Sequence, residues 1–215
     1  MVEQLIHTGE RIDLVISDQE ALDTVFVQEA NSTLRIHLFR ITKDGQPFNL
    51  NDTLHIRHDG TGCRTEIYAL FLLRGTDKAA LHTRVCHDKG QGTSAQIVKF
   101  ILADEAQGEF FGEMTIAQDA QKVEAQQSNR NLLLSDTAVM RTRPQLEIYA
   151  DDVKASHGAS TGQLDESSLF YMQQRCLSRE EGRRLLLRAF MADVVDTVED
   201  EKKRQELMDA IDGII

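Results

Sequence analysis

Short stretches of alternating apolar and polar residues fill the chain from about residue 11 to about residue 157, and no helical period interrupts them. The segments Ser32–Ile41 and Thr53–His58 are examples, and Asp59-Gly60-Thr61-Gly62 supplies a turn after the second. Alternation with a period of two residues predicts strands that bury one face. Further strands are predicted at Ile12–Ile16, Thr24–Val27, Glu66–Leu73, Leu81–Cys86, Ala95–Leu102, Glu109–Ile116, Asn131–Leu134 and Gln145–Tyr149.

Many short strands without intervening helices leave three architectures open: a sandwich, a closed barrel, or a solenoid whose coils stack strands in parallel. The segment Ala117–Ser135 favours the solenoid, because it is rich in Gln, Asn and Ala where a sandwich needs large apolar residues. Side-chain amides that stack from coil to coil can hydrogen-bond to the coil above. The sequence has no clean short repeat, so the β-helix it favours is an irregular one.

After Gln163 the apolar residues follow a helical period. Asp165 or Glu166 opens a short helix that ends near Arg175–Leu177, and Ser178-Arg-Glu-Glu181 is a capping box that begins a second helix. The carboxylates near Glu199 favour a break and a third helix from about 200 to 211, with Leu207 and Ile211 inward. We therefore predict a β-helix core domain over residues 1–162 and a helical subdomain over residues 163–215.

Charge and hydropathy exclude two classes of partner. The formal net charge of −11 at pH 7 disfavours nucleic acid and anionic membrane, since both bind through a cationic surface. No apolar run approaches the roughly 20 residues of a membrane span, and the first residues lack the pattern of a secretion signal. We expect a cytoplasmic protein.

Several ordered motifs in the second half of the chain resemble one family. They are Asn129-Arg-Asn-Leu-Leu-Leu-Ser135, Pro144-Gln-Leu-Glu-Ile-Tyr-Ala-Asp-Asp-Val-Lys154, Ser156-His157-Gly158-Ala159, Gly162-Gln-Leu-Asp-Glu166, Leu169-Phe170-Tyr171 and Leu185-Leu-Leu-Arg-Ala-Phe190. Together they resemble the C-terminal half of SufD, in the SufB/SufD family of iron–sulfur cluster assembly scaffold proteins. The resemblance is dense from about residue 108 to residue 190.

The resemblance implies a right-handed parallel β-helix with a C-terminal helical region. It also implies two partners: a SufB-like subunit at the end of the solenoid and a SufC-like ATPase at the helices. Family members usually carry a helical N-terminal domain, whereas strands begin here within about a dozen residues of Met1. The chain is therefore expected to be a fragment of a longer protein.

His157 is the site residue that the resemblance implies, as a ligand to iron or to a transient iron–sulfur cluster at the site shared with SufB. A neutral imidazole suits iron with one nitrogen while the other is oriented by a hydrogen bond. One imidazole cannot hold a cluster, so no cluster is expected to bind stably to this chain alone. Without the resemblance, a histidine that caps strand or helix ends is the plainer interpretation, and the other six histidines are interpreted as solvated or rung-filling.

The sequence departs from the family pattern at two positions. A cysteine commonly stands two residues before the histidine, and Ala155 occupies that place, so no thiolate ligand comes from there. Cys176 follows Arg175 where the family usually has glycine. If that position needs positive φ, the cysteine costs about 1 kcal/mol relative to glycine.

The second helix carries the predicted ATPase contact. Its inward stripe is predicted to be Leu186, Phe190, Val194 and Val198, which leaves Arg184, Leu187, Arg188 and Met191 on an exposed face. The residues predicted to bind the partner are Arg184, Leu187, Arg188, Phe190 and Met191.

Together these expectations describe a scaffold subunit and no enzyme, since the sequence has no nucleophile beside a base, no phosphate loop and no interpretable carboxylate pair. Two alternatives stay open. One is a purely structural stabiliser of SufB that contacts no metal, and the other is a solenoid enzyme acting on polysaccharide. An exposed strand edge would also allow the isolated chain to form a homodimer.

Overall fold

The computed structural model describes residues 2–42 and 48–212, and these form twelve strands and three helices. The strands are β1 (Val2–Ile6), β2 (Arg11–Ile16), β3 (Asp23–Gln28), β4 (Thr33–Ile41), β5 (Asn49–His58), β6 (Arg64–Leu73), β7 (Lys78–His87), β8 (Thr93–Leu102), β9 (Gln107–Ile116), β10 (Val123–Leu133), β11 (Val139–Ile148) and β12 (Val153–Gly162). The helices are α1 (Glu166–Gln174), α2 (Arg179–Val195) and α3 (Glu201–Asp212).

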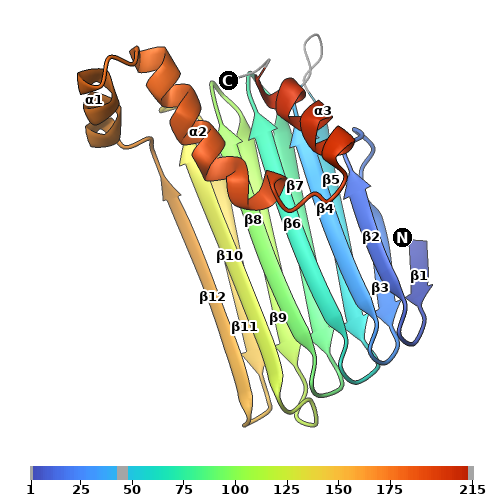
Figure 1. Cartoon of the computed structure of the whole chain (residues 1–215). Coiled ribbons are helices and arrows are strands. Elements are labelled where there is room, and N and C mark those ends of the chain that lie inside the picture. Colours follow the sequence, from blue (N-terminus) through green and yellow to red (C-terminus); the bar gives the residue numbers. More distant parts are fainter. Residues whose placement is uncertain (1, 43–47, 213–215) are drawn as a thin grey trace.

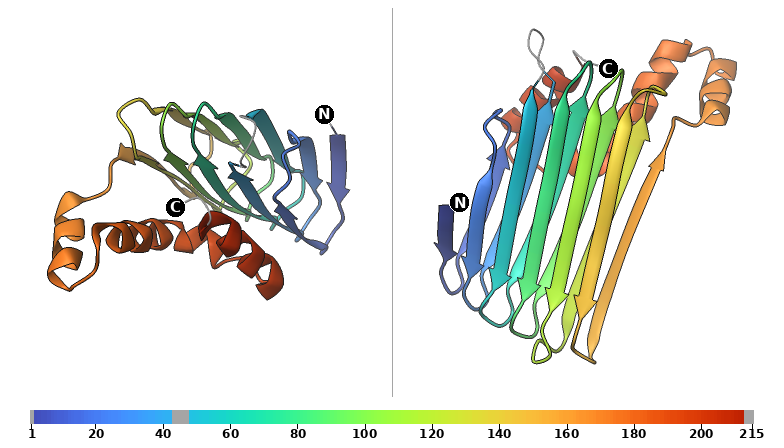
Figure 2. Two further views of the ribbon diagram at one scale, coloured as in Figure 1. Left: turned by 90° about the horizontal axis from the view of Figure 1, so that it is seen from above. Right: turned by 180° about the vertical axis from the view of Figure 1, so that it is seen from behind.

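Successive strands alternate between two parallel sheets that lie face to face (Figures 1 and 2). The odd-numbered strands form one sheet in the order β1-β3-β5-β7-β9-β11, and the even-numbered strands form the other in the order β12-β10-β8-β6-β4-β2. Each pair of consecutive strands is thus one coil of a solenoid, and every strand pairs with the equivalent strand of the next coil. The prediction of a mainly β, parallel β-helix fold with C-terminal helices is confirmed.

The interior core lies between the two sheets and follows from the alternation in the sequence. On β9, for example, every second residue is buried. Leu34, Ile36 and Leu38 of β4 are fully buried, and Phe71 of β6 stacks on Phe100 of β8 with ring centroids 4.3 Å apart. Like side chains repeat from coil to coil because parallel strands place partner residues directly above one another.

A second core joins the helices to the outer face of the even-numbered sheet. Here the C-terminal halves of β6 and β8 bury consecutive residues, which is typical of strands covered on both faces. Leu70, Leu72 and Ile101 of the sheet pack against Leu187 and Val194 of α2. Figure 1 shows α2 and α3 lying across this face, whereas α1 stands beyond β12.

The helix ends agree with the predicted caps. Asp165 accepts hydrogen bonds from the hydroxyls of Ser168 and Ser167 and from their backbone N–H groups. These bonds lower the pKa of its carboxyl to about 2. Ser178 and Glu181 form the predicted capping box at the start of α2. Leu207 and Ile211 of α3 are buried, as predicted.

The sequence missed two strands, β1 and β12. β12 includes the run Ala155-Ser156-His157-Gly158-Ala159-Ser160, whose residue types have low intrinsic strand propensity. The full length of β12 nevertheless pairs in parallel with β10. Tertiary hydrogen bonding therefore overrides local propensity here. The division into domains at residues 1–162 and 163–215 falls between β12 and α1, and it stays a prediction.

Cys176 adopts a left-handed conformation after α1, with φ of 64°. Its N–H donates to the carbonyl of Gln173, and the N–H of Leu177 donates to the carbonyl of Met172. These two bonds form a Schellman motif, in which glycine is the favoured residue at the left-handed position.

We expect Cys176→Gly to raise the free energy of unfolding by about 1 kcal/mol, because it removes the Cβ that makes positive φ unfavourable. Denaturant unfolding followed by circular dichroism measures the change. Cys176→Ala is the control, since it removes the thiol and keeps the Cβ. Equal stabilisation by the two substitutions would show that backbone strain is not the cause.

Candidate functional site

His157 lies in the middle of β12, the strand at one edge of the even-numbered sheet. Within the described residues β12 pairs with β10 alone, so its outer edge has no strand beside it. The imidazole of His157 is exposed. The histidine is therefore at the open end of the solenoid rather than sealed inside it.

The odd-numbered residues of β12 face the interior of the solenoid. Val153 and Ala155 pack against the interior core, and the Thr161 hydroxyl accepts a hydrogen bond from the Asn131 amide at 3.2 Å. Because side chains alternate along a strand, His157 faces the interior as well. It is exposed because, among the described residues, no further coil covers this end of the solenoid. Ala155 faces the interior too, at the position where the resemblance to the family leads one to expect a cysteine.

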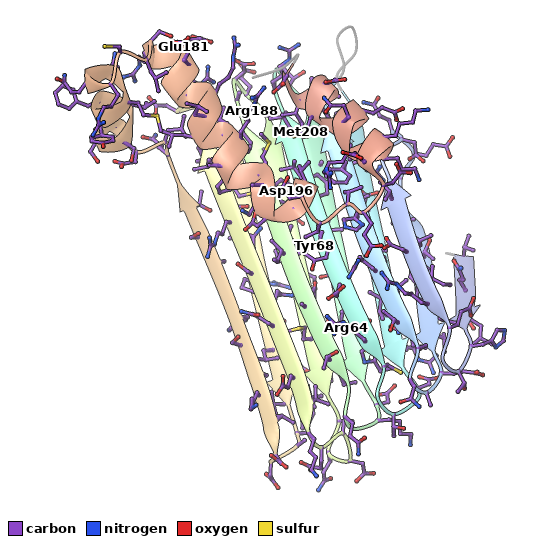
Figure 3. The ribbon with its side chains drawn as sticks, viewed as in Figure 1. Arg64, Tyr68, Glu181, Arg188, Asp196 and Met208 are labelled. Carbon is purple, nitrogen blue, oxygen red and sulfur yellow. The ribbon has the colours of Figure 1, made fainter. Side chains whose placement is uncertain are left out.

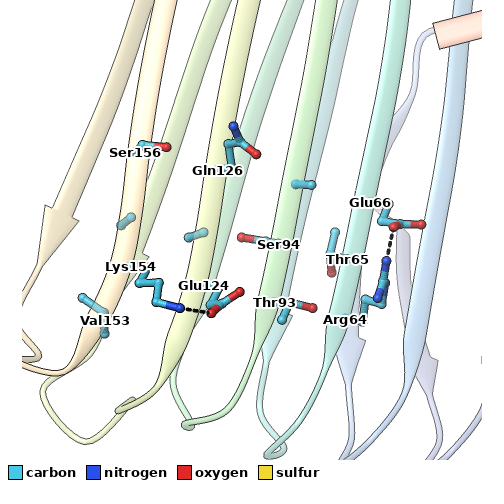
Figure 4. A pocket seen from close by; sticks show the side chains of 13 residues that line it. Arg64, Thr65, Glu66, Thr93, Ser94, Glu124, Gln126, Val153, Lys154 and Ser156 are labelled. Carbon is cyan, nitrogen blue, oxygen red and sulfur yellow. Dashed lines mark hydrogen bonds and ion pairs between the residues drawn. The ribbon is translucent and has the colours of Figure 1, made fainter. Parts of the chain in front are cut away.

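A groove of about 620 Å³ runs over the outer face of β6, β8, β10 and β12 (Figure 4). Two ion pairs line it: Glu124 with Lys154 at 2.7 Å, and Arg64 with Glu66 at 2.6 Å. The first pair lowers the pKa of Glu124 and raises that of Lys154. Both carboxylates of the groove are thus ion-paired. Ser156 lines this groove, and His157 is not one of its lining residues.

Among the described residues no cluster of three or more His, Cys, Asp and Glu side chains could hold a metal ion. Two buried histidines, His58 and His87, lie in the interior with their rings 4.4 Å apart. Each is held by a hydroxyl, from Thr65 and Ser94 respectively, and burial lowers the pKa of His87 to about 4. These two residues pack inside the solenoid, on neighbouring coils.

The predicted exposed face of α2 is wrong at two positions. Leu187 and Met191 are 0% and 1% exposed and pack against the outer face of the even-numbered sheet. Arg184 and Arg188 are exposed as predicted, while Phe190 is half-buried. The Arg188 guanidinium pairs with Asp212 of α3. Figure 3 labels Arg188 on the helical side of the molecule.

The error has a geometric cause. Three steps of four residues, as in the predicted stripe Leu186, Phe190, Val194 and Val198, rotate steadily around a helix of 3.6 residues per turn. Alternating steps of three and four residues stay on one face. The buried residues follow that second pattern: Leu187, Met191, Val194, Val195 and Val198.

Lys99 of β8 anchors α2 to the sheet. Its side chain is only 3% exposed, and its ammonium donates to the Asp193 carboxylate and to the Phe190 carbonyl. The same ammonium lies 4.5 Å from the centroid of the Phe190 ring. Burial lowers the pKa of Lys99, and the Asp193 carboxylate opposes that shift. Phe190 is therefore engaged with the protein's own sheet.

Three exposed apolar side chains on the helices were not among the predicted contacts. Phe170 and Tyr171 of α1 are 63% and 59% exposed, and Leu185 of α2 is 45% exposed. They lie on α1 and the N-terminal part of α2, which project past the edge of the sheet (Figure 2). The signal in the sequence was the doublet Phe170-Tyr171, since a short helix that buries only Leu169 has no inner face for both rings.

A family model described as "SUF system FeS cluster assembly, SufBD core domain" matches residues 20–190, which span most of the strands and α2 as far as Phe190. The chain belongs to the SufBD core family.

Individual members of the SufBD core family agree with this assignment. The chain is 38% identical to the iron–sulfur cluster assembly protein SufD of Escherichia coli over 122 residues, 57% of the chain and 29% of that protein. It is 38% identical over 135 residues to a SufBD family protein of Synechocystis, covering 63% of the chain and 30% of the relative. SufD of Bacillus subtilis is 32% identical over 173 residues, 80% of the chain and 39% of that protein. The chain thus spans about a third of the length of these relatives.

SufBD core proteins are named for assembly rather than for a catalysed reaction, and the resemblance to SufD noted from the motifs is confirmed. No helix in residues 2–42 and 48–212 has the length and apolar character that a bilayer crossing requires. The cytoplasmic location stays a prediction.

Proposed function

We propose that this chain is a non-catalytic scaffold part of a SUF-type iron–sulfur cluster assembly complex. Its open solenoid end pairs with a SufB-like subunit, and His157 contributes one ligand to iron or to a transient cluster there. The helices receive a SufC-like ATPase. The single observation that carries the proposal is the position of His157 in a member of the SufBD core family. The residue faces the interior side of β12, in the last coil, and is nevertheless exposed.

The uncovered end of the solenoid supports pairing with another subunit. β11 and β12 are the last strands of their sheets, and each has one unpaired edge within the described residues. Val139, Ile148 and Tyr149 beside this end are 38%, 42% and 61% exposed. Unpaired backbone groups next to exposed apolar side chains favour addition of a partner's strand or surface.

The chemistry of His157 supports transient rather than stable cluster binding. Imidazole is a borderline ligand that suits iron, but clusters in proteins need several ligands. Because Ala155 offers no thiolate, the remaining ligands would come from the SufB-like partner. Iron and cluster are cargo of this complex rather than resident cofactors of the chain.

The ATPase contact is proposed on a revised surface. Arg184 and Leu185 of α2, with Phe170 and Tyr171 of α1, are exposed on the part of the helical region that projects beyond the sheet. Aromatic side chains and arginine are enriched in protein interfaces. Leu187 and Met191 are excluded because the sheet already covers them.

We expect His157→Ala to lower the initial rate of cluster assembly at least about tenfold in a complex reconstituted with SufB-like and SufC-like subunits. Loss of an outer-shell partner alone typically costs about 10–100-fold in metal affinity or activity, and His157 is proposed as a direct ligand. Ser156→Ala is the matched control, since it changes the neighbouring residue on the outer face. Iron and sulfide content and absorption spectra of the purified complex give the readout.

Ala155 favours a second candidate function that requires no metal contact, because this chain has no thiolate two residues before His157. In that case the chain stabilises the SufB-like partner only. An unchanged assembly rate in His157→Ala, with the complex still formed, would favour this stabiliser over the ligand role.

A further inference from the structure

Gln127 is a buried amide without a hydrogen-bond partner. Gln127 is 2% exposed, and neither its Oε1 nor its Nε2 has a hydrogen-bond partner among the described residues. The adjacent inward residues of β10 are different: Asn129 bonds to Asn131, to Thr142 and to the Val98 carbonyl. A buried polar group with both atoms unpaired is uncommon in proteins and calls for a physical reason.

The neighbours of Gln127 in its row are Gln96 on one side and His157 on the other. Parallel pairing places Gln127 opposite Gln96 of β8 and opposite His157 of β12. Strands in a sheet lie about 4.8 Å apart, so side chains in one row are within reach of one another. All three residues face the interior, because Ala125 and Ala155, two positions earlier on β10 and β12, both pack in the interior core.

The opposite sheet gives Gln127 no side-chain partner at this level. There the row consists of Thr83, Gly112 and Pro144 on successive coils. A Cβ at Gly112 would lie 2.3 Å from the Nε2 atom of Gln127, so glycine makes room for the amide. Thr83 already donates to Oε1 of Gln96 at 2.8 Å. A carbonyl-type oxygen can accept a second bond, so Gln96 Oε1 still has a free acceptor position.

From this arrangement we propose that Gln127 is the positioning residue for His157. Its Oε1 accepts the proton of one ring nitrogen of His157, and its Nε2 donates to Oε1 of Gln96. Both bonds would join side chains of one row, on strands that the backbone already pairs. Thr83 of the opposite sheet and the row Gln96, Gln127 and His157 then form one chain of hydrogen bonds from the interior to the open end.

The consequence is a fixed tautomer of the imidazole. A neutral imidazole has one N–H donor and one nitrogen with a lone pair. If Gln127 binds the N–H, the other nitrogen keeps its lone pair, which is the form that a metal accepts. The inference deepens the proposed function, because it rests on His157 as a ligand. The hydrogen bond itself can be measured without iron.

The test is nitrogen-15 NMR of the imidazoles in the full chain, at alkaline pH where the ring is neutral. His157→Asn identifies the His157 signals. In the wild type we expect one ring nitrogen with the shift of a protonated nitrogen and the other with that of a lone-pair nitrogen. Gln127→Met keeps the side-chain length and removes the hydrogen bonds, so the two shifts should move toward each other as both tautomers become populated.

Gln126→Met is the matched control, since Gln126 is the same residue type one position earlier on the exposed outer face. It should leave the two His157 shifts unchanged. If Gln127→Met fails to fold, Gln127→Glu replaces it, because the carboxylate keeps an acceptor and should preserve the single tautomer. Wild-type shifts in Gln127→Met, or mixed tautomers in Gln127→Glu, would overturn the inference. Neither result depends on cluster assembly, so failure of the His157 ligand role is a separate outcome.

Discussion

Replacing Asp52 by leucine is expected to lower the free energy of unfolding by about 3–5 kcal/mol, because the substitution removes the buried counter-charge of the Arg40 guanidinium. The Asp18 carboxylate that remains is 3.6 Å away and its side chain is 64% exposed. Arg40 of β4 and Asp52 of β5 both have side-chain exposures of 0%. They are joined by two hydrogen bonds, from Nε to Oδ2 at 2.9 Å and from Nη2 to Oδ1 at 2.7 Å. Urea unfolding monitored by circular dichroism gives the free energy.

The double variant Arg40→Met/Asp52→Leu separates the charge effect from loss of packing. Replacing a buried ion pair with apolar side chains of similar size often costs little, whereas removing one partner is strongly destabilising. We therefore expect the double variant to be more stable than Asp52→Leu alone. The carbonyls of Asp18 and Glu20 lose a donor in the double variant, so full recovery is not expected.

A surface pair provides the control for Asp52. Arg57 and Asp59 are also 2.7 Å apart, but their side chains are 42% and 36% exposed. Removing one partner of an exposed pair usually changes stability by less than about 1 kcal/mol. If Asp59→Ala and Asp52→Leu had similar effects, burial of the Arg40 charge would not be the cause.

Phe100→Ala is the second substitution with a large expected effect, a loss of about 3–5 kcal/mol. The Phe100 ring is fully buried and stacks on Phe71 at a centroid distance of 4.3 Å with an interplanar angle of 9°. Truncation removes buried apolar area and leaves a cavity between the sheets, which the stacked coils on either side can fill only in part. The same unfolding experiment measures the loss.

Phe111→Ala is the matched control for Phe100. Phe111 lies on β9, is half-buried on the outer face, and contacts the Arg143 guanidinium at 4.5 Å from the ring centroid. We expect this substitution to cost roughly 1 kcal/mol, from partial burial and an exposed cation–π contact. A loss at Phe111 as large as that at Phe100 would contradict the assignment of the core to the space between the sheets.

The candidate site was predicted only in part from the sequence. His157 was selected from a motif, and its exposure at the open end is a property of the fold. Gln127 was noted only as one of several amides in a Gln- and Asn-rich segment. Its relation to His157 follows from the register of β10 and β12, which no local pattern specifies. The inner and outer faces of α2 were confused for a similar reason, since a helix apolar on two sides does not show which side meets the sheet.

By itself, the sequence determined the elements whose causes are local: strands from two-residue alternation, the capping box at Ser178 and the break before α3. These depend on interactions within about four residues, so they can be read along the chain. Only the tertiary structure decided which residues form a row, because Gln96, Gln127 and His157 are roughly thirty positions apart. The length of each coil and the hydrogen bonds between parallel strands bring such residues together, and these are properties of the assembled solenoid.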